Sequence, residues 1–206
     1  IIARWIPVTL GRTIAALLLG GALGLSLAWK TPQRGAPALR AFLVCLQSVP
    51  GFCFLLLLLW GSSRLLGATP LSQPELYEFW TVAAAAAYPM GTLGLFILER
   101  TGLEGSPPRH VDFMRLLHLP RTFIRTILFR ETLVGSVPIL LNSLAPALTS
   151  VTLAEWLFGL DGFGLIFIRS CELGDQSVVI GGTLILAACL LIAISVPLRR
   201  RRRDRR

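Results

Sequence analysis

Charged residues are scarce in this chain of 206 residues: Asp, Glu, Lys and Arg make up 15%, whereas hydrophobic residues make up 54%. A soluble domain of this length needs more polar residues than that to cover its surface. The mean hydropathy, +0.70, is correspondingly high. The composition therefore excludes an ordinary soluble domain and predicts a membrane protein.

Histidine and cysteine are also scarce: the chain has two histidines and four cysteines. Both histidines, His110 and His118, lie in a charged stretch, so no metal site is predicted within the spans. Three cysteines, Cys45, Cys53 and Cys189, lie in apolar runs without metal-motif spacing and are interpreted as small packing residues. The chain also lacks a glycine-rich phosphate-binding loop with Lys and Ser or Thr. It is therefore predicted to bind no cofactor and to carry no catalytic residue.

Five apolar runs are long enough, or nearly so, to cross a bilayer core of roughly 30 Å as helices. They are residues 13–29, 41–60, 80–98, 132–153 and 178–198. The predicted fold is an all-α membrane protein with one transmembrane domain, residues 1–198, and a basic tail, residues 199–206. The first run has no small-residue cleavage site, so it is interpreted as a span and not as a signal peptide.

Basic residues are concentrated in three segments that alternating spans place on one side. Residues 30–40 carry three Lys or Arg, residues 99–131 carry six and residues 199–206 carry seven, sixteen of the twenty in the chain. The positive-inside rule makes this side cytoplasmic, together with the C-terminus, and makes residues 154–177 an outer loop. The tail is expected to contact anionic lipid, with nucleic acid a distant second interpretation. Arg12 lies near the outer end of its span, where it would snorkel outward or face a partner.

Small and polar residues inside the first two spans are candidates for helix contacts and for a solute path. Gly20 and Gly24 form a GxxxG pattern, which allows close helix approach. Pro50 is expected to kink the second span or to divide it. Gln47 and Ser48, which precede it, either face a path or satisfy the carbonyl group that the proline frees.

The fourth span contains Asn142 between two prolines, Pro138 and Pro146. Such an irregular helix is expected to face protein or water and not lipid. Asn142 is interpreted either as a pathway residue or as an interhelical hydrogen-bond partner. The chain shows no internal repeat and no carboxylate within an apolar run, and both observations weigh against a secondary transporter.

Residues 99–131 form the one long charged segment of the chain. Basic side chains recur there at near-helical spacing, at Arg115, His118, Arg121 and Arg125. Pro120 disfavours helical geometry at the residue before it, so two short helices are predicted to meet there. Such a segment between apolar spans either contacts a soluble partner or is a solvated loop.

A glycine-rich stretch follows the fourth span, and its residues carry a resemblance to a known family. Glu155, Phe158, Gly162 and Gly164 follow the pattern Glu, two residues, Phe, three residues, Gly, one residue, Gly, and Asp175 precedes a Val-Val pair and two further glycines. This pattern resembles binding-protein-dependent ABC importer permeases of the dipeptide/oligopeptide/nickel branch. The stretches PVTLGRTIAALLLGGALGLSLAW and SVPGFCFLLLLLWG are similar to two helices of the same family.

The resemblance implies a type I ABC importer permease fold in the inner membrane, with five of six spans present and one more before Ile1. It also implies four kinds of partner: a second permease, cytoplasmic ATPases that bind ATP and Mg²⁺, a periplasmic or lipid-anchored solute-binding protein, and membrane lipid. The solutes implied are peptides, nickel or related small molecules. Pathway candidates are Gln47, Ser48 and Asn142, and the outer-loop motif is Glu155, Phe158, Gly162, Gly164 and Asp175.

The resemblance also implies that residues 109–131 dock on the ATPases through a coupling helix. The family pattern is similar to Val-x-x-Ala-Arg-Ala-x-Gly-Leu-Ser, and Val111, Arg115 and Leu119 match it. Met114, Leu116, His118 and Pro120 depart from it, with His118 at the glycine position. The residues implied in coupling are Val111, Asp112, Arg115, His118, Leu119, Arg121 and Arg125.

Two other functions are compatible with the sequence. An ATP-independent channel or secondary transporter subunit would be driven by an ion gradient. A membrane scaffold would bind a cytoplasmic partner through its charged segment without moving a solute.

Overall fold

The computed structural model describes residues 2–30, 36–66, 74–100, 116 and 120–203, and all regular structure in these residues is helical. The all-α prediction is confirmed. The helices are α1 (Ile2–Lys30), α2 (Ala36–Ser48), α3 (Gly51–Leu66), α4 (Pro74–Arg100), α6 (Arg121–Asn142), α7 (Leu144–Phe158), α8 (Phe163–Leu173) and α9 (Gln176–Arg203).

Two helices of the described chain are long and apolar enough to cross a membrane unbroken, over Arg4–Lys30 and Glu75–Arg100. Two bent pairs raise the number to four if each pair is one span: Ala36–Ser48 with Cys53–Gly61, and Thr126–Asn142 with Leu144–Phe158. A shorter apolar helix covers Gln176–Ala188 and overlaps the first half of the fifth predicted span.

The second predicted span, residues 41–60, is not one helix. α2 and α3 meet at Val49 and Pro50 with a bend of 99°. Pro50 has no N–H to continue the hydrogen-bond ladder, and the first bond after it runs from the Cys53 amide to the Pro50 carbonyl at 2.9 Å. The sequence predicted a disruption at this position, and the structure shows that it separates two helices.

The fourth predicted span, residues 132–153, is also divided. α6 ends at Asn142 and α7 begins at Leu144, with a bend of 46°. Pro146 cannot donate to the carbonyl of Asn142, which explains why the ladder is interrupted there. At its other end α6 begins directly after Pro120 and runs for 22 residues, so the predicted short helix after this proline is part of one long helix.

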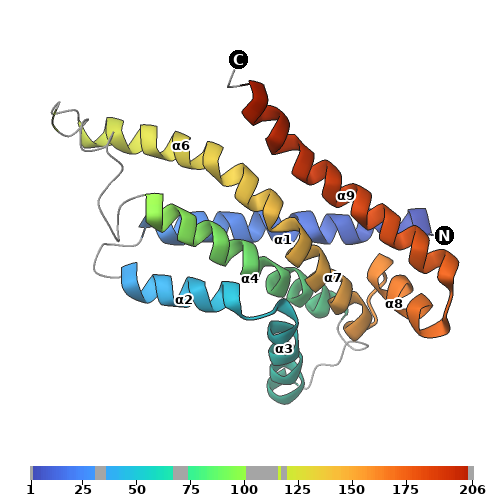
Figure 1. Ribbon diagram of the computed structural model, residues 1–206. Coiled ribbons are helices and arrows are strands. Elements are labelled where there is room, and N and C mark those ends of the chain that lie inside the picture. The colour runs from blue at the N-terminus through green and yellow to red at the C-terminus, as the bar shows by residue number, and fades with distance from the viewer. Residues whose placement is uncertain (1, 31–35, 67–73, 101–115, 117–119, 204–206) are drawn as a thin grey trace.

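The tightest helix pair is α1 with α4, which lie side by side along most of their length (Figure 1). A Cβ atom at Gly24 would lie 2.6 Å from the carbonyl oxygen of Met90, and one at Gly20 would collide with the carbonyl oxygen of Ala86. The two glycines therefore permit backbone contact that any larger residue would prevent. This confirms the close approach predicted from the GxxxG pattern.

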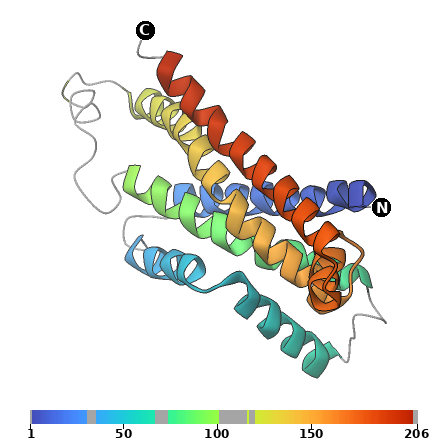
Figure 2. The ribbon, with the colours of Figure 1, turned by 45° about the vertical axis from the view of Figure 1, so that its right-hand side comes forward.

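The helix ends that flank the basic segments gather at one end of the bundle. The ends of α1, α4 and α9 and the starts of α2 and α6 lie there, whereas α8 and the N-terminal end of α1 lie at the opposite end (Figure 2). This arrangement agrees with the same-side placement inferred from the alternation of spans.

The predicted outer loop, residues 154–177, is mostly helical. It contains the end of α7, all of α8 and the start of α9. Gly159 and Gly174 adopt left-handed backbone angles, with φ of 66° and 72°, and each ends a helix. Because glycine adopts this geometry without steric cost, the chain reverses within two short turns and needs no long loop.

Candidate functional site

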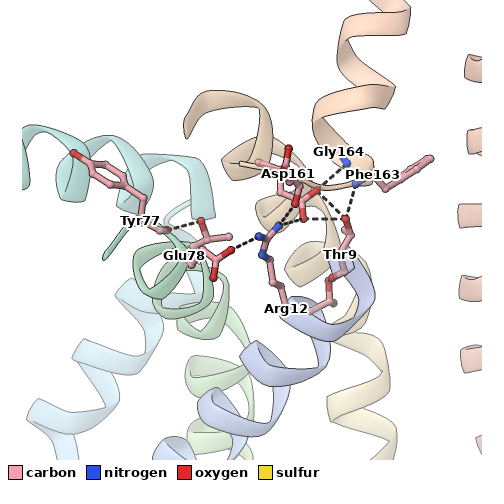
Figure 3. A network of polar contacts seen from close by, with 10 residues as sticks. Thr9, Arg12, Tyr77, Glu78, Asp161, Phe163 and Gly164 are labelled. Carbon is pink, nitrogen blue, oxygen red and sulfur yellow. Dashed lines mark hydrogen bonds and ion pairs between the residues drawn. The ribbon is translucent and has the colours of Figure 1, made fainter. Parts of the chain in front are cut away.

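A group of charged and polar residues, centred on a buried carboxylate, lies at the α8 end of the bundle. We call it the polar cluster, and it consists of Thr9 and Arg12 of α1, Glu78 of α4, Glu155 of α7 and Asp161 of the turn before α8 (Figure 3). The first two amides of α8 complete it. Four helices and a turn therefore meet around the pair formed by Arg12 and Glu155.

Glu155 is fully buried and accepts hydrogen bonds from three sides. The Thr9 hydroxyl lies 2.9 and 2.8 Å from its two oxygens, Arg12 Nη1 donates at 2.8 Å, and the Gly164 amide donates at 2.8 Å. An ionised carboxylate without such partners would cost several kcal/mol to bury. The donors offset that cost and fix the position of the side chain.

Arg12 joins the buried part of the cluster to its exposed edge. Nη1 donates to Glu155 and, at 2.7 Å, to the carbonyl of Asp161, whereas Nη2 pairs with Glu78 at 2.6 Å. The side chain of Glu155 is 0% exposed and that of Glu78 is 55% exposed. The planar guanidinium group presents its donors in a fixed fork, so one side chain connects three elements of the fold.

The start of α8 is held directly by this cluster. The amide of Phe163 donates to the Thr9 hydroxyl at 2.9 Å, and the amide of the next residue, Gly164, donates to Glu155. Amides in the first turn of a helix have no partner within the helix, and a carboxylate is favourable at that end of the helix dipole. The cluster therefore caps α8 with residues of α1 and α7.

The glycines of the sequence motif make room for the carboxylate. A Cβ atom at Gly162 would collide with the carboxyl group of Glu155, and one at Gly164 would lie 2.5 Å from the carbonyl oxygen of Thr152. Gly162 has extended backbone angles that any residue can adopt, so space, and not conformation, excludes a side chain there.

The remaining two motif residues lie outside the cluster. Phe158 is buried and packs edge-on against Tyr77 of α4, with ring centroids 4.9 Å apart. Asp175 lies at the far end of α8, where its carboxylate accepts from the amides of Ser177 and Val178 at 3.1 and 3.3 Å. Asp175 therefore caps the start of α9 and is separate from Glu155.

A groove of about 360 Å³ lies between α2, α4 and the α6–α7 bend. It brings together two of the three predicted pathway residues, Gln47 and Asn142, whereas Ser48 is exposed but does not line it. Its other polar lining residues are Tyr88, Thr92, Glu99 and Ser143. The hydroxyl oxygens of Thr92 and Ser143 lie 3.1 Å apart and join α4 to the bend.

Most of the coupling residues predicted in the charged segment lie outside the described residues. These residues are Val111, Asp112, Arg115, His118 and Leu119. The backbones of Arg121 and Arg125 belong to the first turns of α6. Their proposed role therefore depends on the sequence alone.

The polar cluster and the groove lie in a chain whose family can be recognised. Residues 20–200 match the model of the family described as binding-protein-dependent transport system inner membrane component. The chain belongs to this family. The permease is thus a multi-pass membrane subunit of an ABC importer with the type I permease fold, and it belongs to a family of transport components, not of enzymes. No curated protein matches it.

The partners of Glu155 were not predicted from the sequence. Thr9 and Arg12 lie 146 and 143 residues away along the chain, and they precede the region that the family model matches. The one available signal in the sequence was Arg12 itself, a charge near the end of an apolar run. It was expected either to snorkel outward or to face a partner. The structure shows that its partners lie within the same chain.

Proposed function

We propose that this permease imports peptides, nickel or related small solutes and belongs to the dipeptide/oligopeptide/nickel branch of its family. The observation that carries the proposal is the motif around Glu155. Gly162 and Gly164, which stand at the branch's spacing from Glu155, both lie against its buried carboxylate. The membership of the wider family supports the same class of transport.

The proposed assembly contains a second permease, two cytoplasmic ATPases and a solute-binding protein. Permeases of this family work with such partners in ABC importers. ATP and Mg²⁺ would be bound by the ATPases, which dock on residues 109–131. We place the basic segments and the C-terminus in the cytoplasm because of the positive-inside rule.

We propose that the groove between α2, α4 and the α6–α7 bend forms part of the translocation path. Its lining combines hydroxyl and amide side chains with one carboxylate, Glu99, and such groups can replace water around a polar solute as it passes. Both Gln47 and Asn142 are exposed to it, which favours the pathway interpretation of Asn142. The second permease would close the open side of the groove.

An ATP-independent transporter is the alternative that the structure makes worth testing. Glu155 lies in α7, within one of the bent apolar pairs, so a buried carboxylate does occur near a predicted span. Its pairing with Arg12 at 2.8 Å satisfies the charge internally. A carboxylate that carried protons or cations would have to be free for exchange, so we favour the ATP-driven function. A membrane scaffold would explain the charged segment but not a polar groove.

The test measures solute uptake into right-side-out membrane vesicles, freed of inside-out vesicles, that contain the permease with its partners. The probes are radiolabelled trialanine and a nickel–histidine chelate, each supplied with the solute-binding protein. We expect uptake of one of them that requires internal ATP and persists when ionophores abolish the ion gradients. Uptake that follows the ion gradient and does not need ATP would overturn the proposal.

A further inference from the structure

α8 is fixed to the bundle at its first turn and exposed toward its other end. The amides of Phe163 and Gly164 are bonded to the polar cluster. Near the far end, the side chains of Arg169, Cys171 and Glu172 are exposed, and Leu173 is 84% exposed. A protein that engages the exposed part of α8 would therefore act on an element whose position is set by Glu155 and Thr9.

The polar cluster also connects α8 with the bend that lines the groove. Glu155 belongs to α7, and α7 begins directly after Ser143, which lines the groove. At the groove the bend meets α4 through the Ser143 and Thr92 hydroxyls, which lie 3.1 Å apart. α8, α7 and the bend thus form a continuous connection from one end of the bundle to the groove.

We infer that Arg12 and Glu155 are a positioning pair, through which engagement of α8 by the solute-binding protein is transmitted to the helices that line the groove. The inference rests on the proposed function, because it requires a partner on the α8 side and ATPases on the other. Neither residue lines the groove, so they act through α8, α7 and the bend at Ser143.

The geometry assigns unequal roles to the two carboxylates that Arg12 contacts. Glu155 is enclosed and held from three sides, so removal of its charge changes the bonding of α8 directly. Glu78 is more than half exposed, and a solvent-exposed ion pair contributes little. Glu78→Gln is therefore a matched control for Glu155→Gln: both substitutions remove one carboxylate charge beside the same guanidinium group.

The experiment measures ATP hydrolysis by the purified complex of both permeases and the ATPases, with MgATP, before and after addition of the solute-binding protein. We expect Glu155→Gln to lower the stimulated-to-basal ratio by at least about fivefold, the lower end of typical coupling between sites, while the basal rate is retained. Glu78→Gln should change the ratio by less than about twofold.

A double variant separates transmission from a loss of stability. Arg12→Gln combined with Glu155→Gln removes both buried charges together, so neither is left without its counter-charge. We expect this complex to assemble at the wild-type yield and still to show a low ratio. Hydrogen exchange at the Gly164 amide should be faster in it than in the wild type, because its acceptor, the Glu155 carboxylate, is replaced by a neutral amide.

The outcomes distinguish this inference from the function on which it rests. A wild-type ratio in Glu155→Gln or in the double variant would overturn the inference alone. A parallel fall of basal and stimulated rates in every assembled variant would also overturn it, since that is the result of a structural role only. A wild-type complex that contains no ATPase would overturn the proposed function, and the inference with it.

Discussion

Glu155 has no access to solvent, and its burial is stable only because Arg12, Thr9 and an α8 amide surround it. The charge of Arg12 is shared between this buried carboxylate and the exposed Glu78. The two carboxylates therefore depend on Arg12 to very different extents. Substitutions at Arg12 and Glu78 should reveal this difference.

Arg12→Gln should lower the free energy of unfolding by about 3–5 kcal/mol, because it leaves a buried carboxylate without its counter-charge. Glu78→Gln should lower it by at most about 1 kcal/mol, since that pair is exposed to solvent. Thermal unfolding of the purified permease in detergent measures both effects. Equal losses in the two variants would contradict the distinction between the buried and the exposed pair.

At the scale of single residues, the sequence predicted the members of the motif but not their partners. The spacing of Glu155, Gly162 and Gly164 singled them out together, and the structure places both glycines against that carboxylate. Thr9 and Arg12 could not be predicted as its donors, because contacts across more than 140 residues depend on how helices pack and leave no local pattern. Asp175 was grouped with Glu155, although it caps α9 instead.

At the scale of helices, two of the prolines accompany the interruptions of the spans, and glycines determine how closely α1 and α4 pack. Pro50 and Pro146 each remove one backbone donor, and an interruption is found at or before each of them. The interruption at Pro50 could be predicted from the sequence, whereas in the fourth span the sequence indicated only an irregular helix, and Pro138 lies inside the unbroken α6. The bends of 99° and 46° could not be predicted, because they depend on which neighbouring helix each half packs against.

The contact of α1 with α4 can be tested with a matched pair of glycines in α1. Gly24→Ala should destabilise the permease, because the added methyl group would lie 2.6 Å from the Met90 carbonyl oxygen. Gly11→Ala has no atom within 4 Å of the added group, and it should be neutral or stabilising by up to about 1 kcal/mol. Thermal unfolding in detergent measures both variants. Destabilisation by Gly11→Ala alone would contradict the packing.

The groove offers a second comparison at this scale. Gln47→Ala and Asn142→Ala should each change the rate of solute uptake several-fold, because both side chains line the groove. Ser48→Ala, next to Gln47 but outside the lining, should leave uptake unchanged. The vesicle assay described above measures all three. An effect of Ser48→Ala equal to that of Gln47→Ala would show that the groove is not the path.

At the scale of the whole molecule, we infer the orientation of the permease in the membrane from the positions of its basic segments. The helix ends that flank them gather opposite α8 (Figure 2). The same-side placement was predicted from the sequence, because the Lys and Arg residues fall in segments that alternate with the apolar spans. The family was likewise predicted from local motifs, and the match over residues 20–200 confirms its broader class.

Cys171 tests this orientation, since it is an exposed residue of α8. A variant in which it is the only cysteine should react with a membrane-impermeant maleimide in right-side-out vesicles. A cysteine at the tail position, Asp204→Cys in a cysteine-free background, should react only in inside-out vesicles. The opposite pattern would reverse the proposed topology.

The central claim, that the permease is driven by ATPases through its charged segment, is tested most directly by affinity purification from native membranes. We expect the tagged chain to bring with it a second permease and ATPase subunits. These ATPases should be lost when residues 111–125 are replaced by a neutral linker of equal length. They should be retained when the arginines of residues 199–206 are replaced by glutamine, a control that also removes positive charge from the cytoplasmic side. Recovery of the intact chain without any ATPase, across several mild detergents, would contradict the account.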